Sequence, residues 1–242
     1  MSGYVDLHAH HLFAVDDGAP DLANAVEMVN TVAGLGFSQL YATPHQRSGM
    51  FMPSRQSIDA AHAELNQTLR GSGGPTLALG FENFWDEVLA ERIAAGTIPS
   101  YDDGPAFLFE VNTGLMPSGL ERTLFELRLK GKLPVMAHPE RYTAIQNQLD
   151  RAEPIGRTAA MVIDLAALDG AHGKPQMRTA RRLVLEGLAH AAATDIHRAE
   201  DGPAIAAGIA WIRKQRGVGA LHTLLSENPR RILTGELPEP LG

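Results

Sequence analysis

Short runs of apolar residues alternate with longer stretches in which apolar residues recur every three or four positions, from one end of the chain to the other. Seven of the short runs have the length and composition of buried β-strands. They are GYVDL (3–7), SQLYAT (38–43), TLALG (76–80), AFLFEV (106–111), LPVMA (133–137), AMVIDL (160–165) and AHAAAT (189–194). The stretches between them have the spacing of amphipathic helices.

The first of these helical stretches shows the pattern most clearly. Leu22, Val26, Val29 and Ala33 share one helical face, and the Pro-Asp pair at 20–21 suits a helix start. Similar spacing occurs at Leu65 and Leu69, at Leu120, Leu124 and Leu127, and between Leu183 and Leu188. Strands that alternate with helices predict a parallel sheet joined by crossovers, and seven such units predict a closed or nearly closed α/β barrel. A doubly wound open sheet is the alternative.

The length and composition favour a single domain over residues 1–242. A chain of 242 residues with 44% hydrophobic residues can fill one barrel core. RGSGGP (70–75) is typical of a loop between a helix and a strand, and the last residues, 235–242, are expected to form a loose tail.

Composition and charge exclude several classes of site and partner. The chain has no cysteine, which excludes disulfides, thiolate metal sites and cysteine nucleophiles and fits a reducing cytoplasm. It shows no signal peptide and no run of eighteen apolar residues, so we expect a soluble cytoplasmic protein without a membrane span. The net charge is −7 and no basic block occurs, which argues against nucleic acid as a partner.

Polar residues that can bind metal follow six of the seven predicted strands. They are His8 and His10, His45, Glu82, Glu110, His138, and Asp195 with His197. The carboxyl ends of the strands in a parallel α/β barrel open on one face, where active sites are built. The sequence therefore predicts that these side chains meet at one rim.

For a single histidine after a strand, a surface position or a hydrogen-bonded core position is the more common role. His8 and His10, however, are two residues apart and share a face of an extended chain. Glu82 and Glu110 stand among Leu, Phe and Val, where a buried carboxylate is costly unless it is paired or bound to metal. Together these residues favour a metal site built from nitrogen and oxygen ligands.

Other polar residues are not counted as ligands. His11, His62, His172, His190 and His222 lie in helical patterns, in loops, at a strand start or opposite His10. Asp164 ends a predicted strand, where it either lines the pocket or caps the next helix.

Seven motifs occur in an order that resembles a known superfamily. DLHAH, DDG, ATPH, GFE, AHPERY, TDIH and ENPRRIL, spread over almost the whole chain, resemble the polymerase and histidinol phosphatase (PHP) superfamily. Within it the chain is most similar to the bacterial tyrosine-protein phosphatases of capsule and exopolysaccharide operons. The resemblance implies a distorted (β/α)7 TIM-like barrel of the PHP type, with three divalent ions at the carboxyl-terminal face.

The resemblance also implies a ligand set for each ion. The first ion takes His8, His10, Glu82 and Asp195, the second shares Glu82 and adds Glu110 and His138, and the third takes Asp16, His45 and His197. Asp17 is the neighbouring acidic alternative to Asp16, and Asp6 is expected to orient a ligand histidine from behind. The donor types suit manganese, iron, cobalt or zinc, with manganese as the first choice.

The implied activity is that of a metal-dependent protein-tyrosine phosphatase, in which a metal-bound hydroxide attacks phosphorus. Arg141 is the first candidate to hold the phosphate, with an ion pair to Glu140 or another carboxylate as its equally frequent alternative role. Arg198 and Arg47 are further catalytic candidates. The implied partner is a cognate bacterial tyrosine kinase that regulates polysaccharide synthesis, and the oligomeric state is not readable from the sequence.

Some residues depart from the family pattern and leave other readings open. Gln46 stands where the family often has a histidine, TDIH replaces the more common SDAH, and residues 111–119 differ. These departures bear more on the substrate than on the metals. A PHP-type phosphoesterase acting on a small metabolite such as histidinol phosphate is the main alternative. A metal-dependent amidohydrolase fits less well because no predicted strand ends in lysine, and a non-catalytic scaffold would not need open metal positions.

Overall fold

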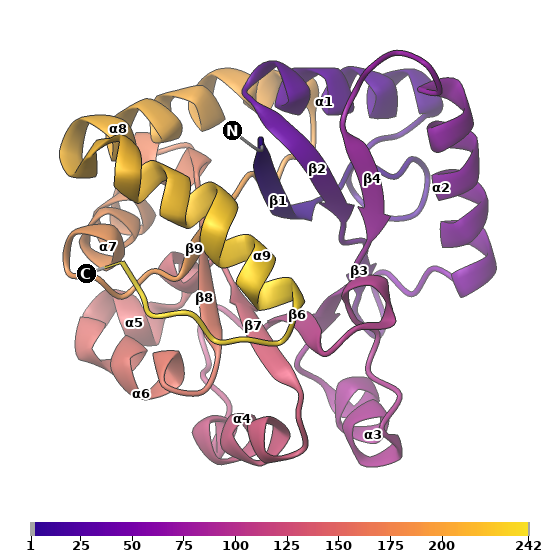
Figure 1. Ribbon diagram of the computed structural model, residues 1–242. Helices are drawn as coiled ribbons and strands as arrows, with labels where there is room; N and C mark the ends of the chain where they lie inside the picture. Colours follow the sequence, from indigo (N-terminus) through magenta and orange to yellow (C-terminus); the bar gives the residue numbers. More distant parts are fainter. Residues whose placement is uncertain (1–2, 242) are drawn as a thin grey trace.

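The computed structural model describes residues 3–241. Figure 1 shows strands at the centre with helices packed around them. The strands are β1 (Tyr4–Ala9), β2 (Phe37–Ala42), β3 (His45–Gln46), β4 (Thr76–Leu79), β5 (Glu82–Phe84), β6 (Ala106–Glu110), β7 (Leu133–Ala137), β8 (Ala160–Asp164) and β9 (Ala191–Ala193). The α-helices are α1 (Leu22–Gly34), α2 (Arg55–Thr68), α3 (Glu87–Ala95), α4 (Leu120–Leu129), α5 (Thr143–Asn147), α6 (Ala152–Gly156), α7 (Lys174–Leu185), α8 (Gly202–His222) and α9 (Asn228–Leu233).

The strands pair in parallel and form a ring of two hydrogen-bonded sheets. One sheet has the order β1-β2-β4, and the other has the order β3-β5-β6-β7-β8-β9. Backbone bonds join the first strand to the end of the last: Asp195 N donates to His8 O at 2.8 Å, and His10 N donates to Ile196 O at 3.0 Å. The first and last strands are therefore neighbours, as a barrel requires.

The two sheets are continuous because two strand positions are bent. β2 leads into β3 through Pro44, which has no N–H to donate to a ladder. Gly80 N donates to Ala42 O at 2.7 Å, and Glu82 N donates to Pro44 O at 3.2 Å, so β4–β5 follows β2–β3 across the bend. The consecutive strands β2 and β3 together fill one position in the barrel, and β4 and β5 together fill the next. The predicted distorted barrel with seven strand positions is confirmed.

The core has two layers, one on each face of the strands. Phe107 and Phe109 of β6 pack in the cluster that includes helix residues such as Val29 and Leu124. Leu108, between the two phenylalanines, belongs to a second cluster built mainly from strand residues, which also includes Ile232 of α9. This alternation places one face of each strand toward the helices and the other toward the barrel interior.

Most of the predicted helices are present, with shifts at their ends. The patterns around Leu22, Leu65, Leu120 and Leu183 correspond to α1, α2, α4 and α7, whereas Leu69 and Leu188 lie just beyond the helices to which we assigned them. α3 and α8 were not among the four predicted patterns. α8 contains four glycines, a residue type that disfavours helix, and its formation depends on packing rather than on local propensity.

Residues 235–241, predicted as a loose tail, form no helix or strand but lie against the barrel. Leu241 N donates to Ala189 O at 3.0 Å, and Asn228 Nδ2 donates to Glu239 O at 3.2 Å. Leu237 packs against the interior cluster, so apolar contacts hold the segment against the barrel. Gly242 lies outside the described residues. Within the described chain, no helix has both the length and the apolar character needed to cross a membrane.

Candidate metal centre

The side chains predicted to meet at one rim lie at the carboxyl ends of the strands. His8 lies in β1 and His10 just after it, His45 begins β3, Glu82 begins β5, Glu110 ends β6, His138 follows β7, and Asp195 and His197 follow β9. His138 and Asp195 have positive φ angles of 34° and 48°. Such backbone is costly for residues other than glycine and is found mainly at functional sites.

Four of these side chains form a compact donor set. His8 Nε2 lies 3.1 Å from His10 Nε2, and both nitrogens lie 3.2–3.4 Å from Glu82 Oε2 and Asp195 Oδ1. Ligand atoms that share one ion at bond lengths of about 2.0–2.2 Å lie about 2.8–3.6 Å apart at tetrahedral or octahedral angles. The spacing therefore fits the ligand shell of a single cation.

Glu82 faces two further histidines with its two carboxylate oxygens. His138 Nε2 lies 3.0 Å from Glu82 Oε1, and His45 Nδ1 lies 2.9 Å from Glu82 Oε2. Glu110 lies 3.8 Å from His45 and 3.9 Å from His138. Glu82 Oε2 and Glu110 Oε1 are buried, and although histidine nitrogens lie near them, the geometry gives neither oxygen a hydrogen bond within residues 3–241. Buried carboxylate oxygens without donors are costly, so these residues fit the binding of cations.

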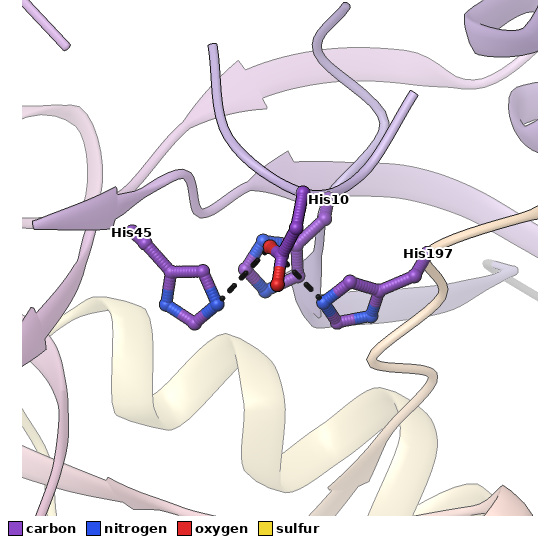
Figure 2. A group of neighbouring side chains, drawn as sticks. His10, His45 and His197 are labelled. Carbon is purple, nitrogen blue, oxygen red and sulfur yellow. Dashed lines mark ion pairs between the residues drawn. The ribbon is translucent and has the colours of Figure 1, made fainter. Parts of the chain in front are cut away.

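A third set lies around His10, His45 and His197, whose rings face one another in Figure 2. Asp17 completes it: its Oδ1 lies 3.4 Å from His45 Nε2 and 3.7 Å from His197 Nε2. The sequence-based prediction gave this position to Asp16 and left Asp17 as the alternative, and the geometry favours Asp17.

Asp16 is turned away from this set because both of its oxygens are already used. Oδ2 accepts from His10 Nδ1 at 2.8 Å and from His45 N at 3.1 Å, while Oδ1 accepts from Gly18 N at 3.0 Å. Gly18 fixes the turn, since a Cβ at that position would lie 1.9 Å from His10 O. Asp16 thus orients His10 from behind, as carboxylates do for metal-binding histidines.

Asp6 joins the first and last strands instead of orienting a histidine ring. Its carboxylate accepts from Thr194 N at 3.0 Å and Thr194 Oγ1 at 2.6 Å, and more weakly from His8 N at 3.3 Å. Complete burial raises the pKa of Asp6 to about 6 despite these bonds. The expected contact with a ligand is made through the backbone of His8 alone.

The electrostatics of the centre reflect its crowded carboxylates. Burial and then the charge of Glu82 raise the pKa of Glu110 to about 7. Burial opposes charge on His10, yet the Asp16 carboxylate and further hydrogen bonds hold its pKa well above the usual value. Positive charge is thus favoured among these groups.

Arg141 lies at the edge of the donor set and is already paired. Its Nη2 lies 2.8 Å from Asp164 Oδ2 and 2.5 Å from Asp195 Oδ2, so the ion-pair alternative is present, with these carboxylates in place of Glu140. The side chain is 23% exposed, and its buried Nε makes no hydrogen bond within residues 3–241. Arg141 therefore remains open to an anion at the mouth of the centre.

The other two arginine candidates have different surroundings. Arg198 is 72% exposed, and within residues 3–241 its guanidinium pairs with Asp201 alone, at 4.0 Å. Arg47 lies over the ring of Phe84, with its guanidinium carbon 4.1 Å from the ring centroid. Neither contacts the donor set directly.

Four of the histidines excluded as ligands lie outside the donor sets. His62 contacts Leu77 O, His190 accepts from Met161 N, and His222 pairs with Glu227. His11 is fully buried, and its ring nitrogens make no hydrogen bond to any described residue.

His172 is the functional candidate that sequence reasoning missed. Its Nε2 lies 2.5 Å from Asp164 Oδ2 and 3.2 Å from Arg141 Nη2. Of the two roles left open for Asp164, the structure shows the cap: its Oδ1 accepts from Ala166 N at 2.7 Å at the start of the following turn. The glycine-rich loop around His172 has no periodicity that would place it, so only the folded chain shows this contact.

Comparison with known proteins gives consistent relatives over nearly the whole chain. The tyrosine-protein phosphatase YwqE of Bacillus subtilis is 28% identical over 235 residues, covering 96% of this chain and 92% of that protein. The tyrosine-protein phosphatase CpsB of Streptococcus pneumoniae is 23% identical over 241 residues, covering 96% and 99%.

Solved structures agree with these relatives. A structure described as YwqE from Bacillus subtilis and CpsB from Streptococcus pneumoniae, "unique metal-dependent tyrosine phosphatases", superposes with a TM-score of 0.86 at 27% identity and covers 98% of this chain and 99% of that one. A D-hydantoinase superposes with a TM-score of 0.57 at 11% identity, and the match covers 100% of this chain and 73% of that one, a likeness of fold alone. The family model for capsular polysaccharide synthesis, CpsB/CapC, matches residues 4–234. This protein therefore belongs to the CpsB/CapC family of capsular polysaccharide synthesis proteins.

Proposed function

We propose that this protein is a metal-dependent protein-tyrosine phosphatase that acts in the cytoplasm on the phosphotyrosines of a bacterial tyrosine kinase controlling capsule or exopolysaccharide synthesis. The observation that carries the proposal is the convergence of nine nitrogen- and oxygen-donor residues at one rim of the barrel. Relatives named as tyrosine-protein phosphatases support the same activity.

Three divalent ions, with manganese as the first choice, fit the donor sets. The donors are His8, His10, Glu82 and Asp195; Glu82, Glu110 and His138; and Asp17, His45 and His197. When bound, such ions supply positive charge for the phosphoryl oxygens and lower the pKa of coordinated water so that it can attack phosphorus near neutral pH.

The chain's own residues would hold the phosphate and the aromatic ring. Arg141 would direct N–H groups at a phosphate oxygen beside Asp195. Phe51 stacks on His45 with ring centroids 5.6 Å apart, and Met50 and Met52 on either side of it are exposed. This apolar edge beside the donor set suits the ring of phosphotyrosine better than a small polar metabolite.

The first experiment is metal analysis of the purified protein, together with p-nitrophenyl phosphate hydrolysis before and after chelation. We expect activity to disappear with the ions and to return when manganese is added. Activity that persists after complete metal removal would overturn the mechanism. Turnover of a phosphotyrosyl peptide is then compared with turnover of histidinol phosphate, and a strong preference for the latter would assign the small-metabolite alternative.

A further inference from the structure

The loop between β8 and α7 brings His172 against the edge of the metal centre without adding it to a donor set. His172 Nε2 contacts Asp164 Oδ2 at 2.5 Å, and Arg141 Nη2 lies 3.2 Å from the same nitrogen and 2.5 Å from Asp195 Oδ2. One guanidinium nitrogen thus lies between His172 and a donor residue of the first set.

Asp164 is a fixed, ionised partner for this histidine. Its carboxylate is buried, one oxygen accepts from Ala166 N, and the other faces His172 and Arg141. Burial opposes ionisation, but the hydrogen bond to His172 and the charge of Arg141 hold the pKa of Asp164 below its usual value. A carboxylate in this position fixes the orientation of the imidazole and stabilises its protonated form.

The orientation of the ring leaves Nδ1 available. The contact of Nε2 with the carboxylate is shorter than its contact with the guanidinium, so Nε2 carries a hydrogen and donates it to Asp164. Nδ1 makes no hydrogen bond to any residue in the range 3–241, and the side chain is 37% exposed. A cavity of about 160 Å³ lined by His172, Asp195 and His197 joins this ring to the donor residues.

We propose that His172 is the general acid that protonates the phenolic oxygen of the leaving tyrosine, with Asp164 as its positioning residue; this inference rests on the proposed phosphatase function. The bond between phosphorus and the phenolic oxygen breaks, and its electron pair stays on that oxygen. The oxygen takes the proton from His172 Nδ1. A water oxygen forms the new bond to phosphorus, and the proton that this water releases restores the imidazolium.

Charged groups around the ring suit this role. Arg141 from the turn after β7 disfavours the imidazolium, while Asp164 from β8 and Asp195 after β9 favour it. His197, Arg198 and Asp201 line the far side of the same cavity. His172 itself is outside the donor sets, so binding of ions does not occupy its free nitrogen.

The test compares two aryl phosphates that differ in leaving group. Phenol is a weaker acid than p-nitrophenol, so phenyl phosphate depends more on a proton donor. For His172→Gln we expect kcat for phenyl phosphate to fall by about 10²-fold or more, with a far smaller loss for p-nitrophenyl phosphate. The alkaline limb of the wild-type pH profile for phenyl phosphate should disappear in the variant. Inorganic phosphate, which has no leaving group, should bind wild type and variant equally in calorimetry.

Two further variants complete the design. Asp164→Asn keeps the shape of the side chain but removes the charged acceptor that orients the ring, and we expect it to lower kcat for phenyl phosphate more than kcat for p-nitrophenyl phosphate, with KM unchanged. His222→Gln removes another histidine that pairs with a carboxylate, far from the donor residues in sequence. It should leave kcat unchanged for both substrates. Equal losses for both substrates in His172→Gln, or weakened phosphate binding, would overturn the general-acid role. Wild-type protein that hydrolyses neither substrate would instead refute the proposed phosphatase function.

Discussion

Asp16 and Asp17 show how two adjacent, chemically identical side chains acquire different tasks. Asp16 has both oxygens bound to His10, His45 N and Gly18 N, whereas Asp17 faces His45 and His197. The DDG motif marks the position of a ligand, but the choice between neighbours depends on the turn that Gly18 permits. No periodicity in the sequence encodes that choice, so the sequence alone could not decide between the two aspartates.

This difference predicts distinct metal phenotypes. Asp17→Asn removes the charged donor of the third set, so we expect the bound metal to fall by about one ion per chain. Asp16→Asn weakens only the orientation of His10, and we expect a loss of about 10–100-fold in affinity at unchanged stoichiometry. Elemental analysis and competition with a fluorescent chelator measure the two effects. Loss of one ion in Asp16→Asn with full occupancy in Asp17→Asn would reverse the assignment.

His190 gives a stability prediction that is independent of the metal centre. Burial lowers its pKa from 6.5 to about 4, while Nδ1 accepts from Met161 N. On acidification, His190 is therefore protonated at higher pH in the unfolded chain than in the folded chain. The stability that neutral His190 contributes is present above pH 6.5 and is lost as pH falls toward 4. At about 1.4 kcal/mol per pH unit, the loss over that window is about 3 kcal/mol.

Replacement of His190 by asparagine tests this linkage, because the amide oxygen can accept from Met161 N without titrating. Urea unfolding of the chelated protein between pH 7.5 and 4.5 should show a smaller loss of stability on acidification for His190→Asn than for wild type. His222→Asn, at a partly exposed position, serves as the control. Parallel stability curves for wild type and His190→Asn would contradict the assignment.

At the level of elements, the strands were predicted better than the bends and the helices that depend on packing. Seven apolar runs identified the strand positions because burial on both faces leaves a local trace in the sequence. The bends at Pro44 and Gly80 were not predicted, although they carry His45 and Glu82 into the centre. α8 was also not predicted. Its glycines disfavour a helix locally, and the packing that stabilises the helix exists only in the folded chain.

The close contact between α8 and the residue after β8 predicts how glycine-to-alanine substitutions in α8 change the stability of the protein. A Cβ at Gly208 would lie 2.0 Å from Leu165 O, whereas a Cβ at Gly219 in the same helix meets no atom within 4 Å. We expect Gly208→Ala to lower the free energy of unfolding by about 1–3 kcal/mol or more. Gly219→Ala should raise it by up to about 1 kcal/mol, because alanine favours helix. Denaturant unfolding of both variants measures the contrast, and equal effects would contradict the close approach.

At the scale of the whole molecule, the donor residues are held together by the closure of the barrel. His8 and Asp195 belong to opposite ends of the chain and meet because Asp6 and Thr194 join β1 to the end of β9. Sequence position could predict that strand ends share a rim, since every parallel strand delivers its carboxyl end to the same face. It could not predict which oxygen faces which nitrogen, because those contacts depend on bends and turns far apart in the sequence.

This arrangement predicts that metal removal destabilises the entire barrel. The donors come from β1, β3, β5, β6 and the segments after β1, β7 and β9, and the unfolded chain does not keep them together. Each ion present at about 100 times its dissociation constant contributes about 2.7 kcal/mol. At about 2–4 °C per kcal/mol for a chain of this size, chelation should lower Tm in calorimetry by about 5–10 °C for each ion removed.

Two variants separate this metal contribution from general loss of stability. Glu82→Gln alters the residue that faces two donor sets, so the difference in Tm between metal-loaded and chelated protein should shrink. Gly208→Ala weakens packing at α8 and should lower Tm in both states while leaving that difference unchanged. The ions would have no structural role if protein shown by elemental analysis to be free of metal melted at the same temperature as the loaded protein. In that case the donor residues would be held in place by the barrel alone, and the charges of the metal-free centre would be balanced by protons on Glu110 and on the histidines whose pKa values are raised, His8, His10 and His45.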